Sequence, residues 1–257
     1  ILALLKDLAV YNVDGIFLDR CRFDAMTSDF SDYTRLKFEE YIGEAVVNFP
    51  ADIMAPDMSE WSGIPSTVPV HFKKWLETLP ETAQSVTRIN DAGSVEPIEQ
   101  VGALDPLKTH QSLLLNIEAP LLLSNLFVEA LQDRPFTRRI LNISSGAARN
   151  PYSGWSIYCT TKAAIDHFSR TFALEQSEKP FPIQIASVAP GVIDTPMQSI
   201  IRQSSEEAFP SLKRFVSLKV SGGVKSAKET AKELIQYLHN DALMSSDPIA
   251  DLRNLPK

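Results

Sequence analysis

Glycine is scarce in this chain, and the few glycines are widely spread. The 257 residues hold ten glycines, and no three of them form a Gly-x-Gly-x-x-Gly or Gly-x-x-x-Gly-x-Gly array. Such arrays let a backbone approach a pyrophosphate at the start of a helix, because glycine has no side chain. The sequence therefore offers no recognisable turn for the phosphates of a dinucleotide.

Cysteine is rarer still. Cys21 and Cys159 lie far apart and have no metal-ligand spacing. Neither a disulfide framework nor a metal site is expected, and this cysteine usage fits a reducing, cytoplasmic setting.

Basic residues are also in the minority. The 25 lysines and arginines are outnumbered by 32 aspartates and glutamates, and the formal net charge is −7. No segment gathers enough basic residues for a phosphate-backbone footprint, so we expect no nucleic-acid partner. The hydrophobic content of 44% is ample for a packed core.

Long apolar runs are missing as well. The strongest, Leu113–Leu123, is interrupted by Asn116, Glu118 and Pro120 and is too short to cross a bilayer, so we expect no membrane span. The chain begins at Ile1 without a basic region or a cleavage site, which argues against a signal peptide. The missing initiator methionine hints at a fragment.

The pattern of apolar and turn-forming residues predicts two parts. Residues 1–77 combine a βα pattern with a proline-rich loop between Phe49 and Pro69. Composition and motif content change near Leu76–Ala83, so we place the boundary there and expect a second domain over residues 78–257.

The second part alternates strands and helices. The expected elements are a short helix near His71–Leu79, strand Ser85–Ile89, helix Pro106–Leu131, strand Arg139–Ser144, helix Ile157–Glu178, strand Ile183–Val188 and helix Ala227–His239. Alternation with helices of this length predicts an α/β fold with a parallel sheet. The nearly continuous apolar strand Ile183–Val188 fits a sheet covered by helices on both faces.

Tyr158 and Lys162 carry the first chemical signal. They stand four residues apart at the start of a predicted helix, so both side chains project from one face. Such a pair also occurs as an ordinary exposed contact, and Ser145 supplies the context because it ends the preceding strand, where parallel sheets place reactive groups. Ser144 is the alternative serine, but it should point to the opposite face of the strand.

In these residues the chain resembles the short-chain dehydrogenase/reductase family. Tyr158-Cys159-Thr160-Thr161-Lys162 is similar to its Tyr-x-x-x-Lys signature, and Ser145 has the separation of the family's active serine. Asn90-Asp91-Ala92-Gly93 resembles its Asn-Asn-Ala-Gly turn, and Asn116 resembles its active-site asparagine. Pro190-Gly191-Val192-Ile193-Asp194-Thr195 is similar to the segment that meets the nicotinamide amide.

The resemblance is closest to benzil-reductase-like and sepiapterin-reductase-like members. It implies a partial Rossmann-like sheet and an NAD(P)-dependent oxidoreductase that reduces a ketone or diketone by hydride transfer. The implied catalytic residues are Asn116, Ser145, Tyr158 and Lys162. The residues implied to bind NADP or NAD are Asn90, Ala92, Gly93, Tyr158, Lys162, Pro190, Gly191, Val192 and Thr195. The implied partner is a small carbonyl substrate, and family members commonly form homo-oligomers through their long helices.

The expected mechanism is proton transfer from Tyr158. Free tyrosine has a pKa of about 10, and the Lys162 ammonium beside the phenol is expected to lower that pKa toward working pH. The Ser145 hydroxyl would bind the carbonyl oxygen.

Three residues keep two interpretations each. Asn116 either holds a water in the family's proton relay or is an ordinary helix polar group. Thr195 binds the nicotinamide carboxamide or caps a helix that begins near Pro196, and both roles can coexist. Trp155 either walls an aromatic substrate pocket or packs inside the protein.

The family's N-terminal glycine-rich third has no counterpart, so the resemblance implies a truncated domain from about residue 83 on. NADP or NAD preference cannot be read from it. Asp91 departs from the pattern, because a neutral amide usually bridges neighbouring strands there. The strand at Ser85–Ile89 would have a bare edge, and we hypothesise that Gly15–Asp19 docks on it as a substitute.

Residues 1–77 resemble a fragment of a bacterial (β/α)-barrel glycosidase-like family. The resemblance rests on Asp14-Gly15-Ile16-Phe17-Leu18-Asp19-Arg20-Cys21-Arg22-Phe23-Asp24 and Phe30-Ser31-Asp32. Asp19 would be its catalytic-carboxylate candidate, or a solvated residue at a loop end. The chain would then be chimeric, and two alternative functions stay open: an inactive α/β remnant without cofactor binding, and a glycosidase-like module.

Overall fold

The computed structural model describes residues 16–19, 72–73, 76–77, 79, 83, 85–244 and 247–255, and of residues 16–19 it describes the backbone alone. The proline-rich loop and most of the residues that carry the glycosidase-like resemblance lie outside the described residues. Phe72 and Leu76 are helical, as expected for the segment around His71–Leu79.

The described strands form one parallel sheet in chain order. They are β1 (Ile16–Asp19), β2 (Ser85–Asn90), β3 (Thr137–Ile143), β4 (Gln184–Ala189) and β5 (Ile249–Asp251). Every neighbouring pair is parallel. The expected α/β fold class with a parallel sheet is confirmed. The docking hypothesis is confirmed too, because Ile16 pairs with Thr87 and Asp19 with Asn90.

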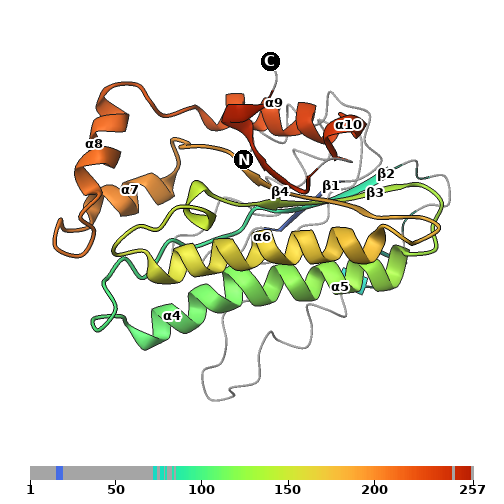
Figure 1. Cartoon of the computed structure of the whole chain (residues 1–257), viewed down its shortest axis with the longest axis horizontal. Helices are drawn as coiled ribbons and strands as arrows, with labels where there is room; N and C mark the ends of the chain where they lie inside the picture. The colour runs from blue at the N-terminus through green and yellow to red at the C-terminus, as the bar shows by residue number, and fades with distance from the viewer. Residues whose placement is uncertain are drawn as a thin grey trace, which may run out of the picture.

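Helices cover the sheet on both faces (Figure 1). One face carries α4 (Pro106–Leu113), the π-helix η2 (Leu114–Glu118), α5 (Ala119–Leu131) and α6 (Ser156–Gln176). The opposite face carries α9 (Ala227–Leu238) and α10 (Asp241–Met244). The remaining helices, α7 (Pro196–Gln203) and α8 (Leu212–Val220), lie beyond the carboxyl ends of the strands.

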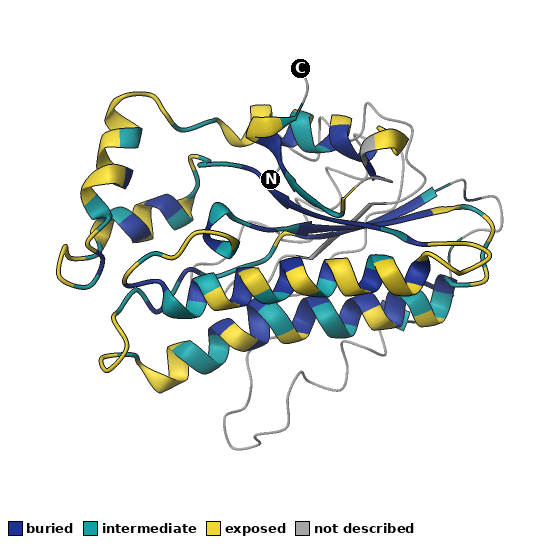
Figure 2. Ribbon diagram, viewed as in Figure 1, coloured by how far each residue is buried: buried dark blue, intermediate teal, exposed yellow. Residues whose placement is uncertain are grey.

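The core lies between these layers, and the buried side of each helix faces the sheet (Figure 2). Ile140 of β3 packs with Phe127 of α5 and Phe172 of α6 on one face of the sheet. Its neighbour Leu141 packs with Tyr237 of α9 on the other face. Side chains of a strand alternate between faces, so a strand buried on both sides must be apolar at successive positions.

Pro106–Leu131 is the one helical stretch, within the described part of the chain, that is long and apolar enough to cross a membrane by length and composition. Half of its most apolar window is buried inside the protein. The stretch packs against α6 and β3, as a core helix of an α/β fold does.

Several elements do not follow from the sequence pattern. Among them are β5 with three residues, α8 with nine and the π-helix η2 with five. The short β5 nevertheless matters for the site, because it carries the following residues to the carboxyl edge of β4.

Candidate active site

The loops that follow β2, β3 and β4 meet at the carboxyl edge of the sheet, beside α7 and α8 (Figure 1). In open parallel sheets, ligands bind at this edge. The residues that the dehydrogenase resemblance singled out lie at the end of β2, on these loops, or on the adjoining turns of η2 and α6.

Ser145 and Tyr158 form the centre of the site. Ser145 follows β3 with an extended backbone, and its hydroxyl accepts a hydrogen bond from the Ala147 N–H at 3.1 Å. Tyr158 lies in the first turn of α6, is 7% exposed, and its hydroxyl is hydrogen-bonded to the Ser145 side chain. The two hydroxyls therefore meet in a largely desolvated place.

Burial raises the pKa of Tyr158 above 10.0, and the hydrogen bond with Ser145 partly opposes this rise. We expected Lys162 to lower this pKa, and that expectation is wrong for the chain on its own. The physical reason is that desolvation penalises the phenolate more than its neighbours compensate. The phenol is thus held protonated at neutral pH, as a proton donor must be.

Lys162 lies one turn after Tyr158 on the same face of α6. Its Nζ donates to the Ile143 carbonyl at 2.7 Å and stands 5.8 Å from the centre of the Tyr158 ring. Burial lowers the pKa of Lys162 to about 8, although Asp91 and Asp166 favour the charged form. An amine with this pKa can both accept and release a proton near neutral pH.

Asn116 approaches the same point from η2. Its amide oxygen accepts from the Ser94 N–H at 2.8 Å, and its Nδ2 donates to the Ser94 carbonyl at 2.8 Å and to Thr161 Oγ1 at 3.1 Å. A β-carbon on Gly93 would lie 3.4 Å from Asn116 Oδ1 and 3.5 Å from Lys162 Nζ. Asn116 therefore ties the loop after β2 to α6, and short π-helical turns of this kind are frequent at functional sites.

Asn90 is turned toward the sheet. Its Nδ2 donates to Asn142 Oδ1 at 2.5 Å, and Asn142 donates in turn to Ser169 on α6 at 2.9 Å. The amide that bridges neighbouring strands is thus Asn90, while Asp91 is exposed and acts on Lys162 through its charge. Ala92 follows on the same loop and is half-buried.

The segment from Pro190 to Thr195 closes the site on the β4 side. Gly191 has a φ of +86°, a conformation that side chains disfavour, so the chain can turn sharply after Pro190. Val192 is half-buried, and its carbonyl oxygen accepts a hydrogen bond from the Lys225 N–H at 2.9 Å. Thr195 stands at the N-cap of α7, but within the described residues its side chain makes no capping hydrogen bond. Its hydroxyl is therefore not used in starting the helix.

Trp155 packs inside the protein. It is 4% exposed, stacks on Phe209 with ring centres 4.4 Å apart, and meets Tyr158 edge-on at 5.4 Å. Its role as a pocket wall is therefore not supported, and it instead fixes the segment before α8 against the Tyr158 ring.

The sequence missed a buried polar network beneath the site. Asp166, 3% exposed, accepts hydrogen bonds from Ser144 Oγ at 2.5 Å, Ser187 Oγ at 2.7 Å and Arg149 Nε at 3.2 Å. Ser144 thus points away from the site, as its place on the strand predicted. The position of Asp166 four residues after Lys162 was the available signal, because such residues share a helix face.

The family comparison agrees with this geometry. A family model described as short chain dehydrogenase matches residues 39–206. The chain belongs to the short-chain dehydrogenase family.

Relatives of this short-chain dehydrogenase include benzil reductase ((S)-benzoin forming) of Bacillus subtilis, 43% identical over 170 residues, which are 65% of this chain and 69% of that protein. Sepiapterin reductase of Bos taurus is 30% identical over 211 residues, covering 80% and 73% of the two chains. A crystal structure of 3-oxoacyl-[acyl-carrier protein] reductase from Brucella melitensis in complex with NAD has a TM-score of 0.70 at 18% identity, covering 98% of this chain and 90% of that chain, and shows the shared fold.

Proposed function

We propose that this short-chain dehydrogenase reduces a ketone or diketone with NADPH or NADH. The observation that carries the proposal is the buried Tyr158–Ser145 hydrogen bond with Lys162 one turn away. The names of the Bacillus subtilis and Bos taurus relatives, benzil reductase and sepiapterin reductase, support a small carbonyl substrate.

A bound reduced nicotinamide would supply a hydride to the carbonyl carbon, and the electron pair of the C=O π bond would move to the oxygen and give an alkoxide. The Ser145 hydroxyl donates a hydrogen bond to the carbonyl oxygen, where negative charge develops. Tyr158 gives its phenolic proton to that oxygen, and the alcohol leaves. The raised pKa of Tyr158 keeps this proton available at neutral pH. Lys162 lies one turn away and, with its pKa of about 8, can pass on a replacement proton.

The described residues fit the nicotinamide end of the cofactor. The small Gly93 leaves a space that faces Asn116 Oδ1 and Lys162 Nζ, which offer one acceptor and one donor. On the opposite side, the sharp turn at Pro190–Gly191 leads to the Thr195 hydroxyl, which α7 does not use. These groups would hold the ribose and the carboxamide.

The phosphate end does not fit equally well. No glycine array for a pyrophosphate occurs anywhere in the 257 residues. This observation favours a second candidate, an α/β protein that keeps the triad but binds a dinucleotide weakly or not at all. The matches favour the reductase over a glycosidase-like module led by Asp19, whose side chain lies outside the described residues.

Titration with NADPH, followed by its fluorescence, separates the two candidates. The reductase predicts saturable binding and oxidation of NADPH with an aromatic diketone. Tyr158→Phe should bind NADPH as the wild type does but turn over at least a hundredfold more slowly, because the proton donor is lost. Absence of binding at millimolar NADPH would overturn the reductase proposal in favour of the remnant.

We also infer that the protein works in the cytoplasm, without a membrane or nucleic-acid partner, and as a homo-oligomer. Leu107 and Leu113 of α4 and Leu174 of α6 are exposed by 43%, 37% and 74%. These residues support an association between the long helices of two copies, which light scattering in solution would detect.

A further inference from the structure

An arginine with a fixed orientation stands at the edge of the site. Arg253 follows β5, in the short helical turn η4 (Leu252–Asn254). Its Nε donates to Asp251 Oδ1 at 2.8 Å and its Nη2 to Asp251 Oδ2 at 2.5 Å. This two-pronged pairing fixes the plane of the guanidinium, which an exposed arginine normally leaves free to move.

The fixed guanidinium lies across the two turns that frame the site. A β-carbon on Gly146, the residue after Ser145, would lie 3.6 Å from Arg253 Nη2. A β-carbon on Gly191 would lie 3.5 Å from Arg253 Cδ. The side chain therefore spans from the Pro190–Gly191 turn to the Ser145 turn, at about van der Waals distance from where a β-carbon on either glycine would lie.

The two partners differ in exposure. The Asp251 side chain is 6% exposed, whereas that of Arg253 is 52% exposed. The carboxylate also accepts the Arg253 backbone N–H at 3.0 Å, so it is held by both the turn and the guanidinium. The pair uses one edge of the guanidinium. The N–H groups of Nη1 make no hydrogen bond to the described residues and remain available to a ligand.

The charge balance of the pair selects the kind of ligand. Asp251 neutralises Arg253, so the guanidinium offers oriented N–H donors with little net charge. An anionic ligand would be repelled by the Asp251 carboxylate that holds the guanidinium, while a neutral carbonyl oxygen would not.

We propose that Arg253 is a specificity-determining residue that binds the second oxygen of a neutral vicinal dicarbonyl while the first oxygen lies at Ser145 and Tyr158. The inference rests on the proposed reductase function and names the substrate class. Tyr152 lies near enough to Arg253 to contribute to the raised pKa of that guanidinium.

Calorimetric titration with a matched pair of ligands tests the inference without turnover. Benzil carries two adjacent carbonyls, and 1,2-diphenylethanone lacks one of them. The wild-type chain, with and without NADP⁺, should bind benzil about tenfold more tightly, the effect of one hydrogen bond to a charged donor. Equal affinities, or no measurable binding of either ligand, would overturn the inference.

The variants separate recognition from folding. Arg253→Ala alone leaves the Asp251 carboxylate buried without its partner. The double variant Arg253→Ala with Asp251→Asn is therefore the better test. Its thermal unfolding is measured as well, to show that it folds. It should lose the preference for benzil while its affinity for the monoketone stays within twofold. Arg134→Ala, a half-buried arginine before the start of β3, is the matched control and should keep the preference.

Arg253→Lys keeps the charge but not the two-pronged pairing, so it should lose most of the preference as well. A double variant that still prefers benzil would disprove the role of Arg253. A wild-type chain that prefers benzil but binds no NADPH would refute the reductase function alone. Conversely, a chain that oxidises NADPH with benzil but shows no preference over the monoketone would refute the role of Arg253 alone.

Discussion

Lys162 shows how burial sets the chemistry of a single group. Its amine is 7% exposed and has the Ile143 carbonyl as its close partner. A carbonyl accepts a hydrogen bond from the ammonium but does not neutralise it, so desolvation dominates and the pKa falls to about 8. The same desolvation raises the pKa of Tyr158. Burial thus moves the two pKa values apart, so the folded chain holds the proton of the phenol more firmly than the proton of the amine.

The free energy of unfolding should therefore rise between about pH 8 and pH 10.5. In this window the unfolded chain holds a proton on Lys162 that the folded chain has released, since 10.5 is the ordinary value of that pKa. Because the unfolded chain binds more protons than the folded chain in this window, the free energy of unfolding increases with pH. The increase over the window is about 3 kcal/mol. Urea unfolding at several pH values measures this rise.

The comparison with Lys162→Met isolates the contribution of this one amine. The methionine variant should lack the rise, whereas Lys179→Met, a change at an exposed lysine, should retain it. If wild type and Lys162→Met gave parallel pH profiles, the amine would not be desolvated in the folded chain.

Helix α6 acts as the rigid element that carries the site. Its first turns hold Tyr158 and Lys162, and its next turn holds Asp166, which binds the ends of β3 and β4 through Ser144 and Ser187. Asp166 also receives Arg149, whose Nη2 donates to the Ala250 carbonyl of β5 at 3.1 Å. One buried carboxylate therefore connects the helix to three strands, and its charge acts on Lys162.

Replacing this carboxylate should affect stability and electrostatics together. Asp166→Asn keeps the size but removes the charge, so the pKa of Lys162 should fall below about 8. The weakened network should also cost roughly 1–3 kcal/mol of unfolding free energy. NMR titration of the lysine side chains measures the pKa, and urea unfolding measures the stability.

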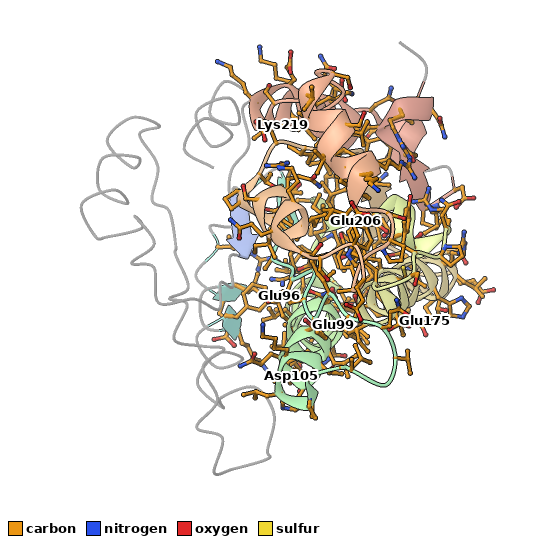
Figure 3. The ribbon with its side chains drawn as sticks, turned by 90° about the vertical axis from the view of Figure 1, so that its left-hand side faces the viewer. Glu96, Glu99, Asp105, Glu175, Glu206 and Lys219 are labelled. Atoms are coloured by element: carbon orange, nitrogen blue, oxygen red, sulfur yellow. The ribbon has the colours of Figure 1, made fainter. Side chains whose placement is uncertain are left out.

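Glu175→Gln, an exposed carboxylate on the same helix, provides the control for that experiment (Figure 3). It should change neither quantity. A purely structural role for Asp166 predicts lost stability with an unchanged pKa of Lys162, and that outcome would contradict the electrostatic role.

The sequence predicted the elements whose own residues determine them. Strand β4 is largely apolar because helices cover both faces of the sheet, and α6 has a helical pattern over its whole length. The π-helix η2 could not be predicted, because it depends on Asn116 bonding to Ser94 across the fold. The sequence shows that Asp251 and Arg253 are two residues apart. It does not show that Arg253 lies beside Gly146, because tertiary packing brings those residues together.

At the scale of the whole molecule, the sheet joins the two predicted parts of the chain. Strand β1 lies within residues 1–77 and runs parallel to β2, and the family match over residues 39–206 extends across the expected boundary. In β2, five of six residues are buried, so a bare edge would expose a row of unpaired backbone groups on a buried strand. Pairing with β1 gives those backbone groups partners.

Breaking the β1 ladder should therefore expose the edge of β2. Phe17 pairs with Arg88 in the register, and Phe17→Pro removes a backbone donor and disfavours the strand. Hydrogen exchange at Thr87–Asn90 should become at least about tenfold faster, and light scattering should show association that grows with concentration. Phe17→Ala loses the same ring but keeps the amide, so the difference between the two variants reports the ladder alone. Equal exchange in both variants would mean that β1 does not protect β2, and that another segment or a second copy covers this edge.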